Sequence, residues 1–481
     1  MAKKNQILIA YAVATLTAFC YVVIRAIHMD VTYDEAWTIR SFVPVDVINI
    51  IRYEPCDANN HMLNTLLIKL FFITGDHSLF VARIPNILAF ILYCYFGYRI
   101  VSQYLSPLIG ICCYLLLLFN PFVLDFFSLA RGYGLSLGFL IASLYYLIAY
   151  IIAYKPVYAI WAITCGMFAV LSNFSVLNYW LVFCLMITIF SFFNKQLNFK
   201  KTFLYTVSGS VILALLIYEP IRKLKANGNL YYGGNKDFYS DTLTSLAKYS
   251  FYTSETNAFI VYSLNIFLII LVVSCISSFF YNRSLISPKS MFIFITLISA
   301  FSVIMQHLLL DTLYLIDRTA LFFYPLFILT LCFSLNDLKD RWYTKITTAL
   351  ITVAFVINFT NKANLIKTAL WYFDAHSSET LGWLNEVGKR RHKVLNIYYS
   401  WPLQSSFGYY FEENKYPYLK VKEVTEANKY RPYSDFYIYL TQPLDKVDYN
   451  ANEPKPFLSP RTLVREYPHE HIKIYSDVIS H

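Results

Sequence analysis

The sequence predicts a polytopic membrane protein of the all-α class that carries a C-terminal α/β domain outside the membrane. Of its 481 residues, 57% are hydrophobic and 19% are aromatic, whereas only 15% are charged. Apolar stretches with few charges recur along the chain, and about 20 apolar residues are enough for a helix to cross a bilayer. After residue 361 the composition changes to charges of both signs and many tyrosines, which is typical of a soluble domain.

Eleven apolar stretches are candidates for membrane spans. They are residues 6–27, 78–100, 104–121, 132–154, 157–172, 174–193, 202–219, 258–281, 290–310, 319–336 and 346–361. Lys3 and Lys4 precede the first stretch, as they would in a signal peptide, but residues 24–28 are a poor cleavage site. We therefore expect a retained first span.

Lysine and arginine indicate how the spans are oriented, because loops rich in these residues usually face the cytoplasm. One alternating set of loops carries Lys3, Lys4, Arg99, Lys155, Lys195, Lys200, Lys201, Arg283, Lys289, Lys339, Arg341 and Lys345. We expect a cytoplasmic N-terminus and an extracytoplasmic C-terminal domain in a bacterial-type inner membrane. The net charge of +10 is spread over these loops and the tail, so it does not indicate nucleic-acid binding.

The loop at 28–77, between the first two spans, is more polar than a simple connection needs to be. It holds the adjacent carboxylates Asp34 and Glu35 and a second polar group formed by Asp57, Asn59, Asn60, His61 and Asn64. Residues 37–51 and 61–74 show apolar faces at helical spacing and are expected to lie flat in the membrane interface. Alternatively, they are the ends of neighbouring spans. We interpret this loop as the catalytic platform of a membrane-embedded enzyme.

Three arginines, Arg83, Arg131 and Arg318, lie at the expected outer ends of spans. An arginine at this depth is costly unless it has a partner. Because the planar guanidinium matches phosphate geometry, these residues indicate a pocket for a lipid-borne phosphate. Structural arginines that reach the interface are the alternative. Arg222 and Lys223, in the outer loop at 220–257, are either further phosphate contacts or ordinary solvated cations.

A metal site is not predicted, and no cofactor is expected. His61 and His307 could join Asp34 or Glu35 as ligands of a divalent metal, which remains an alternative. The spacing of a known metal motif is missing, however. Of the nine cysteines, only Cys56 lies in a polar loop, so neither a disulfide framework nor a zinc site is indicated.

The tail at 362–481 is expected to form the soluble domain. Residues 393–399 and 435–440 alternate between apolar and polar side chains as strands do, and residues 377–391 have a helical pattern.

Five short motifs follow one another at the expected outer side of the spans. They are Asp34-Glu35 after the first span, Asn60 to Leu63, Arg83-Ile84-Pro85, Ala130 to Tyr133, and Arg318 to Pro325. In this order they resemble the motifs of GT-C fold glycosyltransferases that use polyprenyl-phosphate sugars, a group that includes protein O-mannosyltransferases and aminoarabinose transferases of lipid A. The resemblance covers roughly residues 1–330. The prolines of the family's second motif are replaced here by methionine and leucine.

The resemblance implies a transmembrane GT-C domain at 1–361 that moves a sugar from a polyprenyl phosphate to a protein, lipid or glycan on the outer side. Asp34 would be the general base, Glu35 would position the acceptor or the base, and the anomeric centre would invert. Donor-phosphate candidates are Arg131, Arg318, Arg83, Arg222 and Lys223. Candidates for positioning the acceptor are Asn59, Asn60, His61, His307, Asp317 and Tyr324.

Two other classes of protein share many of these features. A transporter or lipid flippase would also have many spans, but its polar residues would gather near the midplane of the membrane and in repeated halves. An assembly factor that binds proteins through its outer tail would not need the carboxylates of the first loop.

Overall fold

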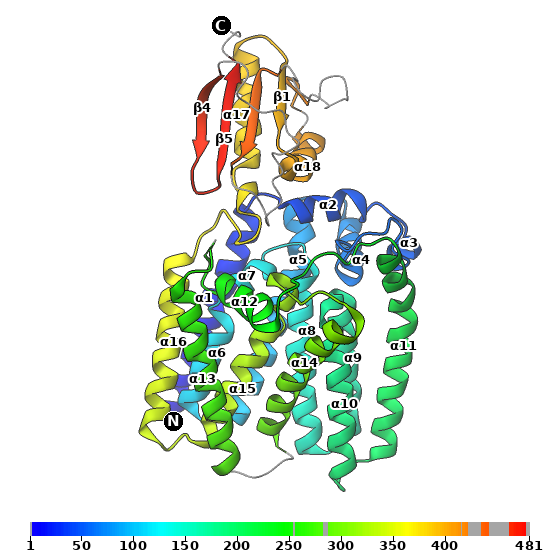
Figure 1. The fold of residues 1–481 in the computed structure, drawn as a ribbon, viewed down its shortest axis with the longest axis vertical. Coiled ribbons are helices and arrows are strands. Elements are labelled where there is room, and N and C mark those ends of the chain that lie inside the picture. The colour runs from blue at the N-terminus through cyan, green and yellow to red at the C-terminus, as the bar shows by residue number, and fades with distance from the viewer. Residues whose placement is uncertain are drawn as a thin grey trace. The chain divides into compact units, whose positions relative to one another are not determined.

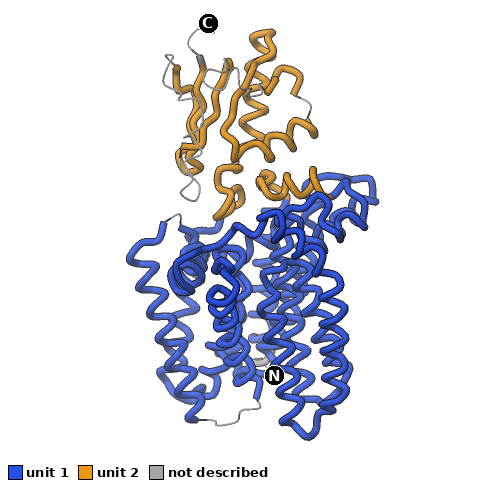
Figure 2. The backbone as a smooth tube through the Cα atoms, turned by 45° about the vertical axis from the view of Figure 1, so that its right-hand side comes forward, with its two compact units in different colours: residues 1–26, 43–363 blue, residues 27–42, 364–481 orange. Residues whose placement is uncertain are grey.

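A computed structural model of the chain describes residues 2–253, 255–281, 287–414, 416–421, 434–441 and 461–477. The chain forms two compact units (Figure 2). Unit 1 contains residues 1–26 and 43–363, and unit 2 contains residues 27–42 and 364–481. The short segment 27–42, which carries the paired carboxylates, therefore packs with the C-terminal region of the chain.

Unit 1 is a bundle of helices, most of them long (Figure 1). These are α1 (Ala2–His28), α5 (Leu79–Tyr104), α6 (Pro107–Leu118), α7 (Pro121–Phe127), α8 (Gly132–Ala153), α9 (Pro156–Ser172), α10 (Leu177–Phe193), α11 (Phe199–Ala226), α13 (Ala258–Tyr281), α14 (Pro288–Leu310), α15 (Phe323–Asp337) and α16 (Trp342–Lys362). Within the described residues, nine helices are long and apolar enough to cross a membrane. The expectation of a polytopic helical membrane protein is confirmed.

Two of the predicted spans differ from single long helices. Residues 104–121 form a pair, α6 and α7, bent by 61°. The break falls at Asn120, whose side-chain oxygen accepts the N–H groups of Phe122 and Val123, and at Pro121, which cannot continue a preceding helix. Residues 157–172 lie in α9, which has 17 residues and is shorter than the nine spans.

Helices α8 and α15 form the interior of unit 1. In an apolar 18-residue segment of each of these two spans, 78% and 83% is buried, compared with 22% in α1, α13, α14 and α16. α8 packs against α5 and α9, and α15 packs against α6, α13 and α14. The peripheral helices keep large apolar side chains exposed, as expected for surfaces that contact lipid.

Short helices connect the spans at the end of the bundle opposite the N-terminus (Figure 1). They are α3 (Val47–Ile51), α4 (Met62–Phe71), η1 (Phe72–Thr74), η2 (Phe174–Val176), η3 (Phe238–Leu243), α12 (Thr244–Ser250) and η4 (Asp317–Ala320). The predicted helix at 61–74 is confirmed as α4 and η1. The single helix predicted at 37–51 is wrong, because the chain turns at residues 42–46, next to Pro44.

Unit 2 contains a five-stranded mixed sheet with the strand order β2-β1-β3-β5-β4. Its strands are β1 (Leu395–Tyr399), β2 (Leu419–Val421), β3 (Phe436–Leu440), β4 (Arg461–Tyr467) and β5 (Ile472–Asp477). β1 is parallel to β2 and β3, whereas β5 is antiparallel to β3 and β4. The helices of this unit are α2 (Tyr33–Ser41), η5 (Tyr372–Asp374), α17 (Ser377–Arg390), η6 (Trp401–Leu403) and α18 (Gln404–Asn414). The predicted α/β character of the tail is confirmed.

Candidate functional site

A buried polar cluster lies in unit 1 where α4 and α8 begin. His61 and Arg131 are the residues immediately before these helices, and only 6% and 1% of their surfaces are exposed. Arg131 donates from Nη2 to Nε2 of His61 at 2.9 Å and from Nη1 to the carbonyl of Asn59 at 3.0 Å. The other ring nitrogen, Nδ1, lies 3.0 Å from the carbonyl oxygen of Ser172, the last residue of α9.

These contacts define the protonation state of His61. A guanidinium can only donate, so Nε2 must accept and the ring proton must be on Nδ1, which donates to Ser172. Burial, followed by the positive charge of Arg131, lowers the pKa of His61 well below its usual range, and the charge of Arg318 adds to this effect. His61 is therefore a neutral side chain that orients Arg131. Both of its ring nitrogens are already engaged.

Two glycines allow α8 to start against this cluster. A Cβ atom on Gly132 would lie 1.9 Å from the carbonyl oxygen of Ser172 and 2.8 Å from Cβ of His61. On Gly134 it would lie 2.4 Å from the carbonyl oxygen of Phe126. Any side chain at these positions would push α8 away, so the glycines fix the depth at which Arg131 sits.

A chain of amides holds the same helix start from the other side. Asn64 donates to the carbonyl of Ala130 at 3.0 Å, Asn86 donates to Oδ1 of Asn64 at 2.8 Å, and the N–H of Leu135 donates to Oδ1 of Asn86 at 2.9 Å. All of the side-chain atoms involved are buried, where a satisfied polar network is rigid and an incomplete one is costly. The network joins α4, α5 and α8.

Arg318 approaches the cluster from η4. Its guanidinium lies 4.2 Å from the ring centre of Tyr232 and donates to the Tyr232 hydroxyl at 3.3 Å. That hydroxyl donates to Asp317 at 2.8 Å, and the N–H of Asp317 donates to Ser245 at 2.9 Å. The charge of Arg318 also contributes to the lowered pKa of His61, so the positive charges of both arginines act on the same buried ring.

Asp317 has an unusual backbone conformation. Its φ of 48° is left-handed, which costs an L-residue other than glycine about 1–2 kcal/mol. The hydrogen bonds to Ser245 and Tyr232 hold this conformation, and it directs the neighbouring Arg318 towards the ring of Tyr232.

The remaining cationic candidates lie elsewhere in unit 1. Arg83, on α5, is fully buried and donates to the carbonyl of Ala26 at 3.0 Å. Arg222 pairs with Glu219 at 2.7 Å and is exposed. Lys223 pairs with Glu54 at 2.5 Å. These contacts place Arg83 against the end of α1, and Arg222 and Lys223 in ion pairs at the end of α11.

Among the candidates for positioning the acceptor, Asn59, His61 and Asp317 take part in the contacts described above. The other three have different partners. The side chain of Asn60 is used inside the loop, between the carbonyl of Ile50 and the hydroxyl of Thr65. His307 is half-buried and contacts the carbonyl of Thr312 at 2.7 Å. Tyr324 donates to the carbonyl of Leu116 at 2.5 Å inside the helix bundle. Within the described residues, no group of three or more His, Cys, Asp or Glu side chains is arranged to hold a metal ion.

The paired carboxylates lie at the start of α2 in unit 2 and have different environments. Glu35 is fully buried and completes a capping box, in which its Oε2 accepts the N–H of Thr32 at 3.0 Å and the hydroxyl of Thr32 at 3.1 Å. Asp34 is 8% exposed and lies in the first turn, where the helix dipole favours a negative charge. Its carboxyl group takes no part in the capping box.

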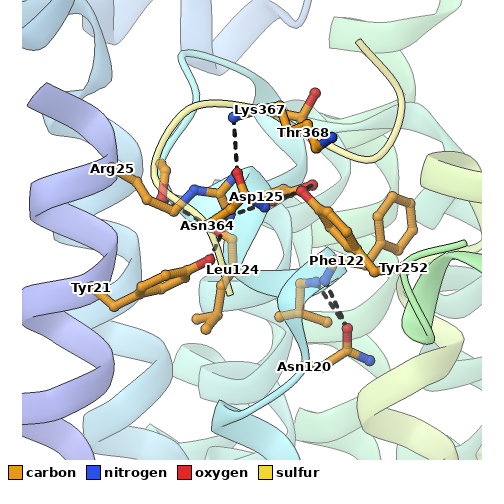
Figure 3. Close-up of polar contacts among 12 residues, drawn as sticks. Tyr21, Arg25, Asn120, Phe122, Leu124, Asp125, Tyr252, Asn364, Lys367 and Thr368 are labelled. Atoms are coloured by element: carbon orange, nitrogen blue, oxygen red, sulfur yellow. Dashed lines mark hydrogen bonds and ion pairs between the residues drawn. The ribbon is translucent and has the colours of Figure 1, made fainter. Parts of the chain in front are cut away.

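Sequence reasoning missed a buried ion pair (Figure 3). Nη1 of Arg25, on α1, lies 2.5 Å from Oδ1 of Asp125, on α7, and neither side chain is more than 2% exposed. The hydroxyl of Tyr252 donates to both oxygens of Asp125 at 3.0 Å, and Arg25 donates to the hydroxyl of Tyr21 at 3.1 Å. The sequence did contain a signal, because Arg25 and Asp125 are each a single charge among apolar residues, and such a charge needs a partner.

The helix bundle with its attached α/β unit defines the class of fold, and solved structures agree with it. No family model and no curated protein sequence matches the chain. Two crystal structures of ArnT from Cupriavidus metallidurans are similar to it. The apo structure has 10% sequence identity and a TM-score of 0.54, covering 100% of this chain and 99% of that one. The structure bound to undecaprenyl phosphate has 9% identity and a TM-score of 0.56, covering 99% and 98%. The chain is an integral membrane protein with the predicted GT-C fold.

Proposed function

We propose that this protein is a membrane glycosyltransferase that uses a polyprenyl-phosphate sugar as its donor. The observation that carries the proposal is the buried Arg131, held by His61 at one end of a GT-C bundle, together with Arg318, whose positive charge also acts on the His61 ring. Preorganised cations of this kind stabilise the charge that develops on a phosphate leaving group. The similar ArnT structure that holds undecaprenyl phosphate supports this class of donor.

In the proposed reaction, a hydroxyl of the acceptor attacks the anomeric carbon of the donor sugar. The bond between that carbon and the phosphate oxygen breaks, and polyprenyl phosphate leaves with the bonding electrons. Asp34 takes the proton of the acceptor hydroxyl as general base, and one displacement inverts the anomeric centre. Asp34 is favoured over Glu35 because the Glu35 carboxylate is engaged by Thr32 in the capping box.

The side of the membrane is part of the proposal. The cluster lies at the end of the bundle that holds α3, α4 and α12, opposite the N-terminus (Figure 1). α9 begins and α10 ends at the end of the bundle where the N-terminus lies (Figure 1). In the sequence, Lys155 directly precedes α9 and Lys195 closely follows α10. Because basic loops usually face the cytoplasm, this arrangement supports transfer on the extracytoplasmic side.

Donor binding tests the proposal directly. The full-length protein in nanodiscs would be titrated with undecaprenyl phosphate, and binding would be followed by native mass spectrometry. Arg131→Ala and Arg318→Ala should each weaken binding by about 10-fold or more, since a lost hydrogen bond to a charged group costs about 1.5–3 kcal/mol. Arg99→Ala is the matched control, because Arg99 lies on α5 with the hydroxyls of Tyr95 and Tyr145 as its partners.

Transfer is then measured with a radiolabelled polyprenyl-phosphate sugar and membranes as the source of acceptor. Asp34→Asn should abolish transfer and leave binding of undecaprenyl phosphate unchanged. Full transfer by that variant would remove Asp34 as the base. Equal affinity of the wild type and both arginine variants would remove the phosphate site.

A further inference from the structure

The start of α2 is held by residues from the C-terminal region of the chain, all within unit 2. The carboxylate of Asp30 accepts the hydroxyl of Ser378 at 2.6 Å and the hydroxyl of Tyr410 at 2.8 Å. It also accepts the N–H groups of His376 and Ser378 at 3.2 and 3.1 Å. Four hydrogen bonds to one carboxylate tie the segment before α2 to the start of α17 and to α18.

The other end of α2 is held as well. Nε and Nη2 of Arg40 donate to Oε1 of Glu412, on α18, at 3.0 and 2.6 Å. Gly408 lets the guanidinium lie against α18, since a Cβ atom there would be 2.3 Å from Nη1 of Arg40. The helix that carries the carboxylate pair is therefore fixed at both ends by α18.

A third contact reaches the residue next to the proposed base. Asp374, in η5, is 1% exposed, and its Oδ2 accepts the N–H of Tyr33 at 2.6 Å. Tyr33 is the first residue of α2, so its N–H has no partner inside the helix and needs one from elsewhere. Asp374 supplies that acceptor immediately before Asp34.

The charge state of Asp374 is set by its surroundings. Burial raises its pKa well above the usual range, and the negative charges of Asp34 and Asp30 raise it further. The hydroxyl of Ser406 and the N–H of Tyr33 act in the opposite direction. Asp374 is therefore protonated more readily than an exposed aspartate.

We propose that Asp374 is a positioning residue for Asp34, which makes the C-terminal region a working part of the catalytic apparatus. Its Oδ2 holds the first N–H of α2 and thereby fixes the direction in which the Asp34 side chain leaves the helix. This inference rests on the proposed function. A displacement of about 1 Å in a reacting group can cost about 100-fold in rate, so the loss of this contact should appear in kcat.

The first test compares two substitutions of Asp374 in the full-length protein. Asp374→Ala removes the acceptor and should lower kcat for sugar transfer by about 10- to 100-fold with an unchanged KM for the donor. Asp374→Asn keeps an oxygen that can accept the N–H of Tyr33 and cannot ionise, so it should retain most of the activity. Glu386→Ala is the control, because Glu386 is an exposed carboxylate on α17.

A second pair of variants removes the same hydrogen bond from the donor side. Proline is well tolerated as the first residue of a helix, and Thr32 before it already has the extended backbone that proline requires (φ −82°, ψ 158°). Tyr33→Pro deletes the N–H, whereas Tyr33→Ala keeps it and removes only the ring that packs on Trp401. Tyr33→Pro should lower kcat as Asp374→Ala does, and by more than Tyr33→Ala.

Hydrogen exchange provides a readout that does not depend on activity. Amides in residues 30–41 should exchange faster in Asp374→Ala than in the wild type or Glu386→Ala. A kcat of Asp374→Ala within twofold of wild type, or an Asp374→Asn variant as defective as Asp374→Ala, would overturn the inference. If the wild type transfers no sugar, the proposed function fails, and unchanged exchange in Asp374→Ala would then also remove the positioning contact.

Discussion

Replacing Arg25 with methionine should destabilise unit 1 strongly, because the partner of Arg25 would stay buried. The side chains of Arg25 and Asp125 are 0% and 2% exposed, and their charged atoms are 2.5 Å apart. In Arg25→Met, Asp125 keeps the hydroxyl of Tyr252 but loses the guanidinium. Removing one member of a buried pair typically costs about 3–5 kcal/mol. Since about 1.4 kcal/mol corresponds to a factor of ten, the equilibrium constant for folding should decrease by roughly two to three and a half orders of magnitude.

The loss can be measured by equilibrium unfolding of the purified full-length protein in mixed detergent micelles, followed by tryptophan fluorescence. A second substitution separates charge from packing. In Arg25→Met/Asp125→Asn the buried charge is gone, and the amide oxygen can still accept the hydroxyl of Tyr252, so most of the stability should return. Arg99→Met serves as the control, since Arg99 is only partly buried and should lose about 1 kcal/mol or less.

Two results would refute this reasoning. One is a free energy of unfolding for Arg25→Met within about 1 kcal/mol of the wild type, which would mean that water or other groups replace the guanidinium easily. The other is a double variant that is no more stable than Arg25→Met, which would assign the loss to packing around the arginine stem.

Three further predictions follow from the site. His61→Gln can still accept from Arg131 and donate to Ser172, so it should bind undecaprenyl phosphate within a few-fold of wild type, whereas His61→Ala should bind about 10-fold more weakly. Because the pKa of His61 is lowered in the folded protein, the unfolded chain binds a proton at a higher pH than the folded one does. The free energy of unfolding of the wild type should therefore decrease as the pH falls below about 6.5. This decrease should be smaller in His61→Gln. Gly132→Ala should prevent correct packing of α8 and lower the melting temperature sharply. Gly382→Ala should be neutral or stabilising, because an added Cβ there meets nothing within 4 Å. An equal effect of both substitutions in a thermal unfolding assay would contradict the close approach of Gly132 to Ser172.

The sequence was most informative where one residue type dominates a long stretch. Apolar runs predicted the spans because each run must cover the hydrocarbon core by itself, whatever its neighbours are. Residues 435–440 were likewise predicted as a strand and contain β3, but all five residues of β3 are buried and not only those of alternate positions. The break between α6 and α7 could have been found, since Asn120 followed by Pro121 is a recognisable helix start.

What the sequence could not predict are partners that lie far apart along the chain. Arg25 and Asp125 are separated by 100 positions, and nothing local to either residue names the other. The contact between Tyr33 and Asp374 spans 341 positions. That Arg131 and Arg318 bind one phosphate stays a prediction from motif order, and the roles of His61 and Glu35 as local structural partners required the geometry of their hydrogen bonds.

The division of unit 2 into residues 27–42 and 364–481 has a consequence for how the protein is made. A ribosome adds about 5–20 residues each second, so the segment with Asp34 waits on the order of tens of seconds before residues 364–481 have been synthesised. During that interval α2 lacks the groups that hold its two ends. A chain whose synthesis stops early therefore keeps its spans but never completes the fold around its carboxylate pair, so incomplete copies in the membrane would be inactive.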